Sequence, residues 1–270
     1  MRRRLVLLAL AAALAAALAG CGDDGIEKRR EAVAEYIRAV NTTQQRFATV
    51  YAEADDALRA FGAKGSMGGR SSDELAEAAA TMRDLRGSLA DIHPPEEARK
   101  LHGELLRLLD LQTGLTRDLS EMARYLPLAS DALRSAEVAR TKLQKALESS
   151  NTAPAQMAAA RSYGKAVDRS LEELREVTPP PVLSIWHDGQ AELLRTSAQL
   201  GYGLADGLES GNRKQIERVL LRFQNASRDA AAVAHAQVLA VRSFNNRVKT
   251  QRALVRKIVQ EQRRLDRAIA

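Results

Sequence analysis

Apolar side chains recur three and four positions apart along almost the whole chain, and this spacing limits the fold more than any other feature. It is clear from Val33 to Phe61, from Leu101 to Met122 and from Ile216 to Ile269. An α-helix places such positions on one face, whereas a half-buried strand needs strict alternation, which the sequence lacks. The sequence therefore predicts an all-α, multi-helix bundle with long, coiled-coil-like N- and C-terminal helices.

Two proline pairs interrupt this helical pattern, in the stretches IHPPEEARKLH and VTPPPVLSIWH. Proline disfavours the helical conformation of the residue before it, but it is well tolerated in the first turn of a helix. Each pair is therefore expected to end one helix and to start the next. The predicted structural corners are Pro94, Pro95, Pro179 and Pro180.

The two corners belong to an internal repeat. A shift of 85 positions (94 to 179) maps Met82–Leu119 onto Val167–Leu204 without a gap, and the matches fall largely on predicted core positions. This pattern predicts a repeated unit of helix, Pro-Pro corner and helix. One helical domain, 27–270, then contains an N-terminal helix at 27–61, repeat unit 1 at 72–150, repeat unit 2 at 152–241 and a basic C-terminal helix extension at 242–270.

About seven helices are expected in this domain. Pro127 is expected to end the helix of the first unit near Tyr125, and a further helix is expected at 130–149. Gly211 and Asn212 are suited to end one helix and to cap the next. No proline or glycine follows them, so the sequence predicts a helix from there to the C-terminus that is either continuous or bent near Ser227 to Asp229.

The N-terminus has the features of a secretory signal peptide at 1–20. Arg2, Arg3 and Arg4 precede an apolar run that is too short to span a bilayer. The next residues, Leu18-Ala19-Gly20-Cys21, resemble the lipobox of bacterial lipoprotein precursors. This resemblance implies that Cys21 becomes the first mature residue and carries diacylglycerol, often with a further acyl chain such as palmitate. Residues 21–26 then form a lipidated tether on the extracytoplasmic face of the cell membrane.

Few residues remain for catalysis. Cys21 is the only cysteine, so its lipidation excludes disulfides, cysteine-ligated metals and thiol chemistry. The sequence contains no nucleophile elbow, phosphate loop or dinucleotide fingerprint. We therefore expect neither enzymatic activity nor a cofactor. The body is similar to uncharacterised all-helical bacterial lipoproteins, a resemblance that implies no activity.

His102 and His187 are the strongest candidates for a ligand site, because both copies of the repeat retain them. One interpretation makes them ligands of a metal or haem inside the bundle. Their surroundings argue against it, since Arg99 and Ser184 stand where a di-iron helix motif places glutamate. The other interpretation is a half-buried histidine that is hydrogen-bonded to a backbone carbonyl exposed by a proline corner.

The C-terminal extension concentrates positive charge, with nine arginines and lysines against Glu261 and Asp266. A basic row next to an apolar seam is suited to anionic lipid headgroups or to an acidic wall polymer, but it is also typical of a solvated coiled-coil flank. Aromatic residues make up only 4% of the chain, and with the extracytoplasmic location this argues against nucleic acid. The candidate surface residues are Arg242, Lys249, Arg256, Lys257, Arg263 and Arg264.

These features favour a lipid-anchored protein of the cell envelope that acts as a non-catalytic helical scaffold or binding module. Its expected partners are the membrane, through the lipid on Cys21, and an envelope protein or cell-wall polymer. The alternative is an extracytoplasmic helical bundle that binds a metal or small ligand through His102 and His187.

Overall fold

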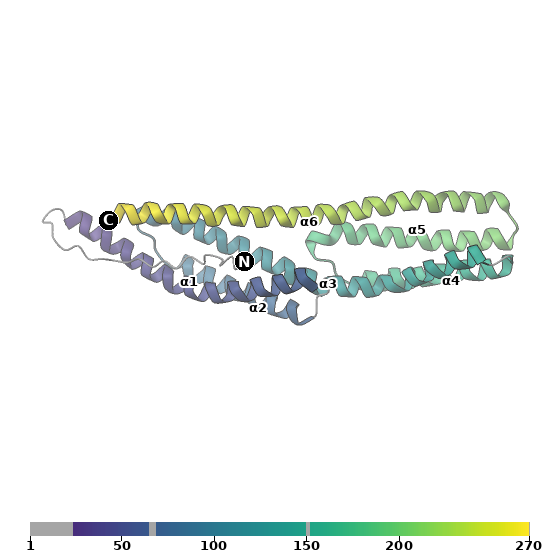
Figure 1. Ribbon diagram of the computed structural model, residues 1–270, viewed down its shortest axis with the longest axis horizontal. Coiled ribbons are helices and arrows are strands. Elements are labelled where there is room, and N and C mark those ends of the chain that lie inside the picture. Colours follow the sequence, from purple (N-terminus) through teal and green to yellow (C-terminus); the bar gives the residue numbers. More distant parts are fainter. Residues whose placement is uncertain (1–23, 65–68, 150–151, 270) are drawn as a thin grey trace. The chain divides into compact units, whose positions relative to one another are not determined.

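The computed structural model describes residues 24–64, 69–149 and 152–269, and all regular structure in these ranges is helical. The predicted all-α class is confirmed, whereas the expected signal peptide and Cys21 lie outside the described residues. Among the described helices, none combines the length and the apolar character needed to cross a membrane. The helices are α1 (Asp24–Lys64), α2 (Gly69–Ala90), α3 (Arg99–Ser149), α4 (Ala153–Glu176), α5 (Ser184–Glu209) and α6 (Arg213–Ile269), with short 3-10 helices η1 (Glu96–Ala98) and η2 (Pro181–Leu183) (Figure 1).

The chain divides into two compact units. Unit 1 comprises residues 1–120 and 245–270, and therefore holds α1, α2, the first part of α3 and the last part of α6. Unit 2 comprises residues 121–244 and holds the rest of α3, α4, α5 and the first part of α6. Each unit has a hydrophobic core of its own.

The proline corners form as the sequence predicts. α2 ends at Ala90, and Pro95 is extended (φ −62°, ψ 163°) immediately before η1. In the same way α4 ends at Glu176, and Pro180 is extended (φ −66°, ψ 149°) immediately before η2. In both corners the α-helix is thus preceded by a single 3-10 turn, whose last residue, Ala98 or Leu183, is buried.

The expected break at Pro127 is wrong, because α3 continues through it to Ser149. The separate helix expected at 130–149 is therefore part of α3, and the described residues form six α-helices. A proline inside a helix removes one backbone hydrogen bond and costs about 3 kcal/mol. The residues on both sides of Pro127 offset this cost, since Tyr125, Ala129 and Ala132 are buried in one core.

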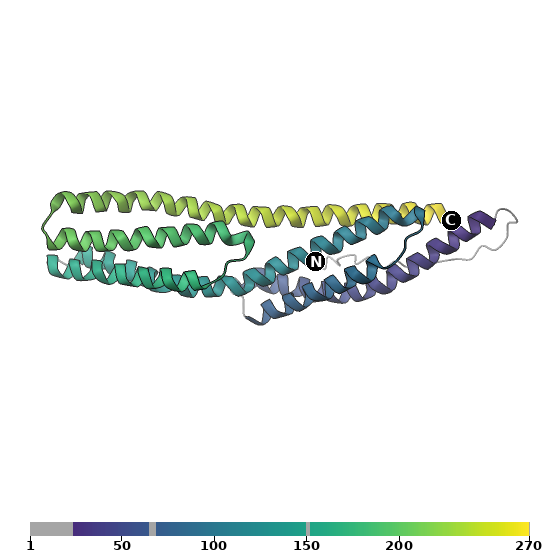
Figure 2. The ribbon, with the colours of Figure 1, turned by 180° about the vertical axis from the view of Figure 1, so that it is seen from behind.

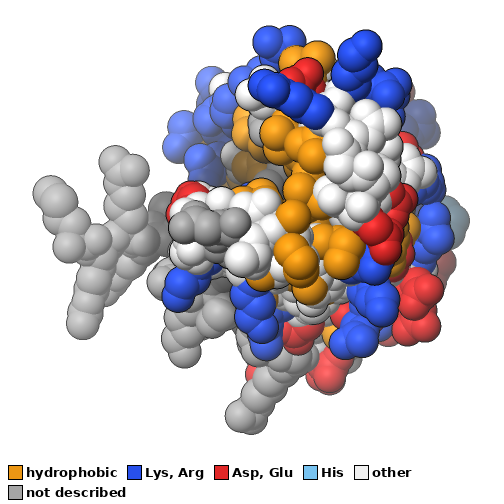
Figure 3. All heavy atoms as spheres, turned by 90° about the vertical axis from the view of Figure 1, so that its right-hand side faces the viewer, with side chains coloured by type: hydrophobic (Ala, Val, Ile, Leu, Met, Phe, Trp, Pro, Cys, Tyr) orange, Lys and Arg blue, Asp and Glu red, His pale blue; other side chains and the backbone are white. Residues whose placement is uncertain are grey.

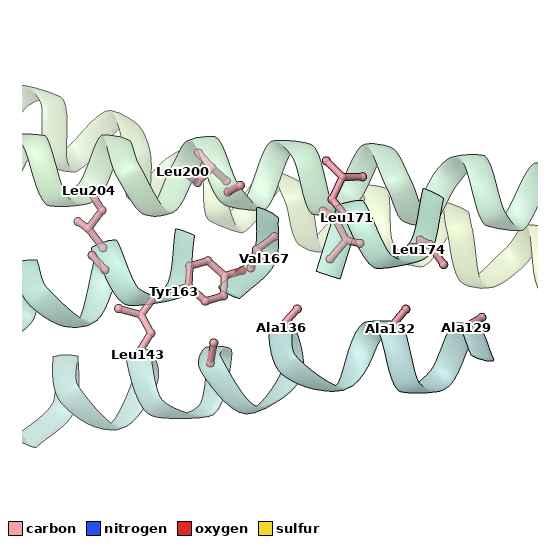
Figure 4. Packing of buried hydrophobic residues seen from close by; sticks show 14 of the residues in the cluster. Ala129, Ala132, Ala136, Leu143, Tyr163, Val167, Leu171, Leu174, Leu200 and Leu204 are labelled. Atoms are coloured by element: carbon pink, nitrogen blue, oxygen red, sulfur yellow. The ribbon is translucent and has the colours of Figure 1, made fainter. Parts of the chain in front are cut away.

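Small side chains on α3 face large ones in the core of unit 2. Ala129, Ala132 and Ala136 lie along one side of α3, and a row of larger residues on α4 lies opposite them (Figure 4). The short side chains let the helices approach closely, and the larger ones fill the space between them. The labelled α4 residues are Tyr163, Val167, Leu171 and Leu174.

Polar residues interrupt the apolar seams of α3 and α6 in unit 1, and they pair with each other. The amide of Gln251 on α6 donates a hydrogen bond to the side-chain carbonyl of Gln112 on α3, and both residues are buried. Arg247 on α6 forms an ion pair with Asp118 on α3. A buried polar pair is satisfied in one alignment of two helices only, so these contacts fix the register of α6 against α3.

The turn between α5 and α6 confirms the expected capping residues. Gly211 has a left-handed backbone (φ 63°), and the side chain of Asn212 accepts a hydrogen bond of 3.1 Å from the amide of Gln215. α6 then runs without interruption for 57 residues. In unit 2 this turn makes α5 and α6 antiparallel (Figures 1 and 2). Figure 3 views the molecule from the side on which this turn lies, and it shows hydrophobic side chains among charged ones.

Candidate functional site

His102 lies in the first turn of α3 and is buried against α1. Its Nδ1 shares a hydrogen bond of 3.4 Å with the hydroxyl of Tyr36 on α1. The centres of the two rings are 5.9 Å apart, and only 3% of Tyr36 and 8% of His102 are exposed. The first corner is therefore tied to α1 by a polar contact inside the core of unit 1.

His187 has the same arrangement in unit 2. It lies in the first turn of α5, and its Nδ1 shares a hydrogen bond of 2.9 Å with the hydroxyl of Tyr125 on α3. Trp186 meets the ring of Tyr125 edge-on, with ring centres 6.1 Å apart and an angle of 86° between the planes. The second corner is thus tied to α3 as the first is tied to α1.

The sequence did not point to either tyrosine, and the expected partner, a backbone carbonyl at the corner, is replaced at the Nδ1 of each histidine by a tyrosine hydroxyl from another helix. The two tyrosines stand in the similar stretches AEYI and ARYL, which are 89 positions apart (36 to 125), whereas the corners are 85 apart. Tyrosine and histidine are separated by 66 positions in unit 1 and by 62 in unit 2, a difference of four. The shift of 85 positions that aligns the two corners does not align the two tyrosines, whereas a shift of 89 does.

Burial influences the protonation states of His102, Tyr36 and Tyr125. Desolvation lowers the pKa of His102 below its ordinary value of 6.5 and raises the pKa of Tyr36 above its ordinary value. Burial, and then the Asp188 carboxylate, raise the pKa of Tyr125 to about 12. At neutral pH both tyrosines are therefore protonated and His102 is neutral. These groups suit a structural hydrogen bond and provide no activated nucleophile.

The structure does not favour the ligand-site interpretation of the histidines. His102 belongs to unit 1 and His187 to unit 2, and each uses its Nδ1 for a tyrosine of its own unit. One imidazole and one protonated phenol are fewer donors than the three or four ligands of a typical protein zinc site. Throughout the described ranges, no group of three or more histidine, cysteine, aspartate or glutamate residues could hold a metal ion.

The candidate basic residues of α6 have different surroundings. Arg242 is in unit 2 and the other five are in unit 1. Arg264 contacts the first corner, because it pairs with Glu261 and donates a hydrogen bond of 3.0 Å to the backbone carbonyl of Glu97. Lys100 also pairs with Glu261, and these contacts, the Lys100 hydrogen bond foremost, lower the pKa of the Glu261 carboxyl despite its burial. Lys249, Arg256, Lys257 and Arg263 are exposed.

Comparison with protein-family models, with curated proteins and with solved structures finds no match to this chain. The features that bear on function are therefore those of the chain itself: the two tyrosine–histidine corners, the exposed basic residues of α6 and the lipobox-like sequence Leu18–Cys21.

Acidic pH is expected to destabilise unit 1 through His102. The folded-state pKa of His102 lies below 6.5, so the unfolded chain takes up the proton first. The contribution of neutral His102 to stability is complete above about pH 6.5 and is lost as the pH falls from there through the lower, folded-state pKa. Below pH 6.5 the free energy of unfolding should fall less steeply in His102→Gln than in the unsubstituted protein.

Chemical denaturation between pH 7.5 and 5 measures this difference. The control is His93→Gln, which removes an exposed imidazole next to the first corner. The same pH slope in His102→Gln and in the unsubstituted protein would contradict a neutral, buried His102.

Proposed function

We propose that the chain is a lipid-anchored protein of the cell envelope and acts as a non-catalytic helical scaffold or binding module. The observation that carries this proposal is the use of His102 and His187 in two buried tyrosine–histidine contacts. The residues best suited to chemistry are thus occupied in holding helices together. Function is then assigned to the anchor and to the exposed helical surfaces.

The anchor is proposed from the lipobox at Leu18–Cys21. Asp24, the first residue of α1, follows Cys21 by only three positions. A diacylglycerol on Cys21, with a further acyl chain, would supply the two or more chains that stable membrane attachment requires. The proposed tether is therefore short, and unit 1 would begin close to the membrane.

The two units are further proposed to be copies of one ancestral bundle. In each unit a first helix carries the tyrosine, a second helix leads into a Pro-Pro corner, and a third helix carries the histidine. α6 supplies the fourth helical segment of both units. Its apolar seam, with Gln251 paired to Gln112 on α3, supports coiled-coil-like packing. A duplicated bundle would present two related helical surfaces to partners in the envelope.

Replacing Cys21 with serine tests the anchor. The unsubstituted protein should incorporate radiolabelled palmitate in bacterial cells, whereas Cys21→Ser should not. Because serine cannot form the thioether, the expected loss of label is essentially complete.

A second variant tests whether labelling needs the lipobox or only a thiol. Cys21→Ser combined with Ser88→Cys places an exposed thiol on α2. This variant should remain unlabelled. Palmitate on either variant would refute the lipobox assignment.

A further inference from the structure

The C-terminal part of α6 has one face in the core and the opposite face in solvent. Gln251, Ile258 and Leu265 are seven positions apart and are buried. A second set of three residues has the same spacing and precedes the buried set by two positions. Each residue of an α-helix advances by 100° around the axis, so the second set lies about 200° away from the buried one. This second set consists of Lys249, Arg256 and Arg263, and all three are exposed.

Three more exposed cations extend this set, and the six together are called the basic face. Between positions 249 and 267 the only exposed carboxylate on α6 is Asp266, since Glu261 is buried. None of the ion pairs found among the described residues involves the basic face. Its charge is therefore available to an external partner. The basic face consists of Lys249, Arg252, Arg256, Lys257, Arg263 and Arg267.

We propose that the basic face docks on the anionic lipid headgroups of the membrane that holds the anchor. This inference rests on the proposed function, because the lipid on Cys21 brings unit 1 to that membrane. The basic face and α1 belong to the same unit, so a short tether keeps the face within reach of the bilayer. Attachment at one point makes the second contact intramolecular, and a weak interaction then suffices.

The geometry favours an extended surface over a compact ligand. Lys249 and Arg263 are fourteen positions apart (263 − 249), which corresponds to about 21 Å along a helix. A row of this length on a convex helix matches many headgroups better than one phosphate. Lysine and arginine side chains near an anionic bilayer each strengthen binding about fivefold, and salt screens the effect.

Vesicle binding tests the docking without the anchor. The protein used is the chain from Gly22 to Ala270, which contains every described residue and no cysteine. It should sediment with vesicles of phosphatidylcholine containing about 30% phosphatidylglycerol, and not with pure phosphatidylcholine. The variant Lys249→Gln/Arg256→Gln/Arg263→Gln should bind the anionic vesicles roughly a hundredfold more weakly, as three fivefold losses predict.

The matched control removes three exposed lysines from unit 2, Lys142→Gln/Lys145→Gln/Lys165→Gln, and changes the net charge equally. It should stay within about threefold of the parent. An equal loss in both variants would overturn the proposal, since net charge alone would then explain the binding. Retention of the parent on immobilised polyglutamate without vesicle binding would assign the face to an acidic macromolecule and also overturn it.

The palmitate experiment and the vesicle experiment fail independently. If the full protein is labelled with palmitate but its Gly22–Ala270 chain does not bind anionic vesicles, the anchor is retained and only the docking is refuted. Vesicle binding by the basic face of a protein that takes up no palmitate would refute only the anchor.

Discussion

Replacing Leu174 with alanine is expected to lower the free energy of unfolding by about 2–5 kcal/mol, the range for a fully buried leucine. Leu174 is 0% exposed in the core of unit 2. It lies in the last turn of α4, immediately before the second corner, and packs in the same cluster as the alanines of α3 (Figure 4). Shortening it leaves a cavity that rigid neighbouring helices fill only in part.

The matched control for this substitution is Leu221→Ala on α6. Leu221 also belongs to unit 2, but 58% of it is exposed. The expected change is within about 0.5 kcal/mol, as is usual for surface positions. Urea denaturation of the three proteins measures both values, and similar losses in the two variants would refute the assignment of Leu174 to the core.

Gly201→Ala is expected to lower the free energy of unfolding by about 1–3 kcal/mol, although alanine is the better helix former. A Cβ at this position of α5 would lie 2.9 Å from the Tyr163 ring. It would also lie 3.1 Å from the amide nitrogen of Gly164 and 3.2 Å from the carbonyl oxygen of Ala160, both on α4. Backbone atoms cannot rotate away, so α4 and α5 would have to separate.

Gly103→Ala on α3 provides the opposite expectation. A Cβ at Gly103 meets nothing within 4 Å. The substitution should therefore stabilise the protein by about 0.5–1 kcal/mol, because alanine loses less conformational entropy than glycine in a helix. Thermal and chemical denaturation compare the two variants. Stabilisation of both would show that α4 and α5 are not in close contact at Gly201.

Local sequence signals predicted the helices and their corners well. The spacing of apolar residues predicted the all-α class, and Pro95 and Pro180 stand where new helical segments begin. Gly211 and Asn212 marked the turn before α6. These features depend on backbone preferences of single residues, which can be read without knowing the neighbours of a helix.

Pro127 shows where such local reasoning fails. Its preference is to end a helix, but α3 continues because buried residues on both sides hold it in the core of unit 2. Tertiary packing decides here, and the packing partners come from α4 and α5. No local signal near Pro127 reports them.

The candidate site was predicted only in part. The sequence singled out His102 and His187 and left open whether they bind a ligand or support a corner. Tyr36 and Tyr125, whose hydroxyls contact the Nδ1 atoms, are more than sixty positions away from their histidines. The sequence likewise showed Gln112 and Gln251 as polar positions within apolar seams, but it did not show that they pair with each other. Contacts of this kind require the alignment of helices, which periodicity alone does not give.

The central claim is that the two histidines serve structure, and double-mutant cycles on the two corners test it most directly. The cycles combine Tyr125→Phe with His187→Leu, and Tyr36→Phe with His102→Leu. The account predicts coupling free energies of about 0.5–1.5 kcal/mol, as for buried hydrogen bonds, with the larger value at the 2.9 Å pair in unit 2. Additive effects in both cycles, with coupling below about 0.3 kcal/mol, would contradict the structural role of the corners.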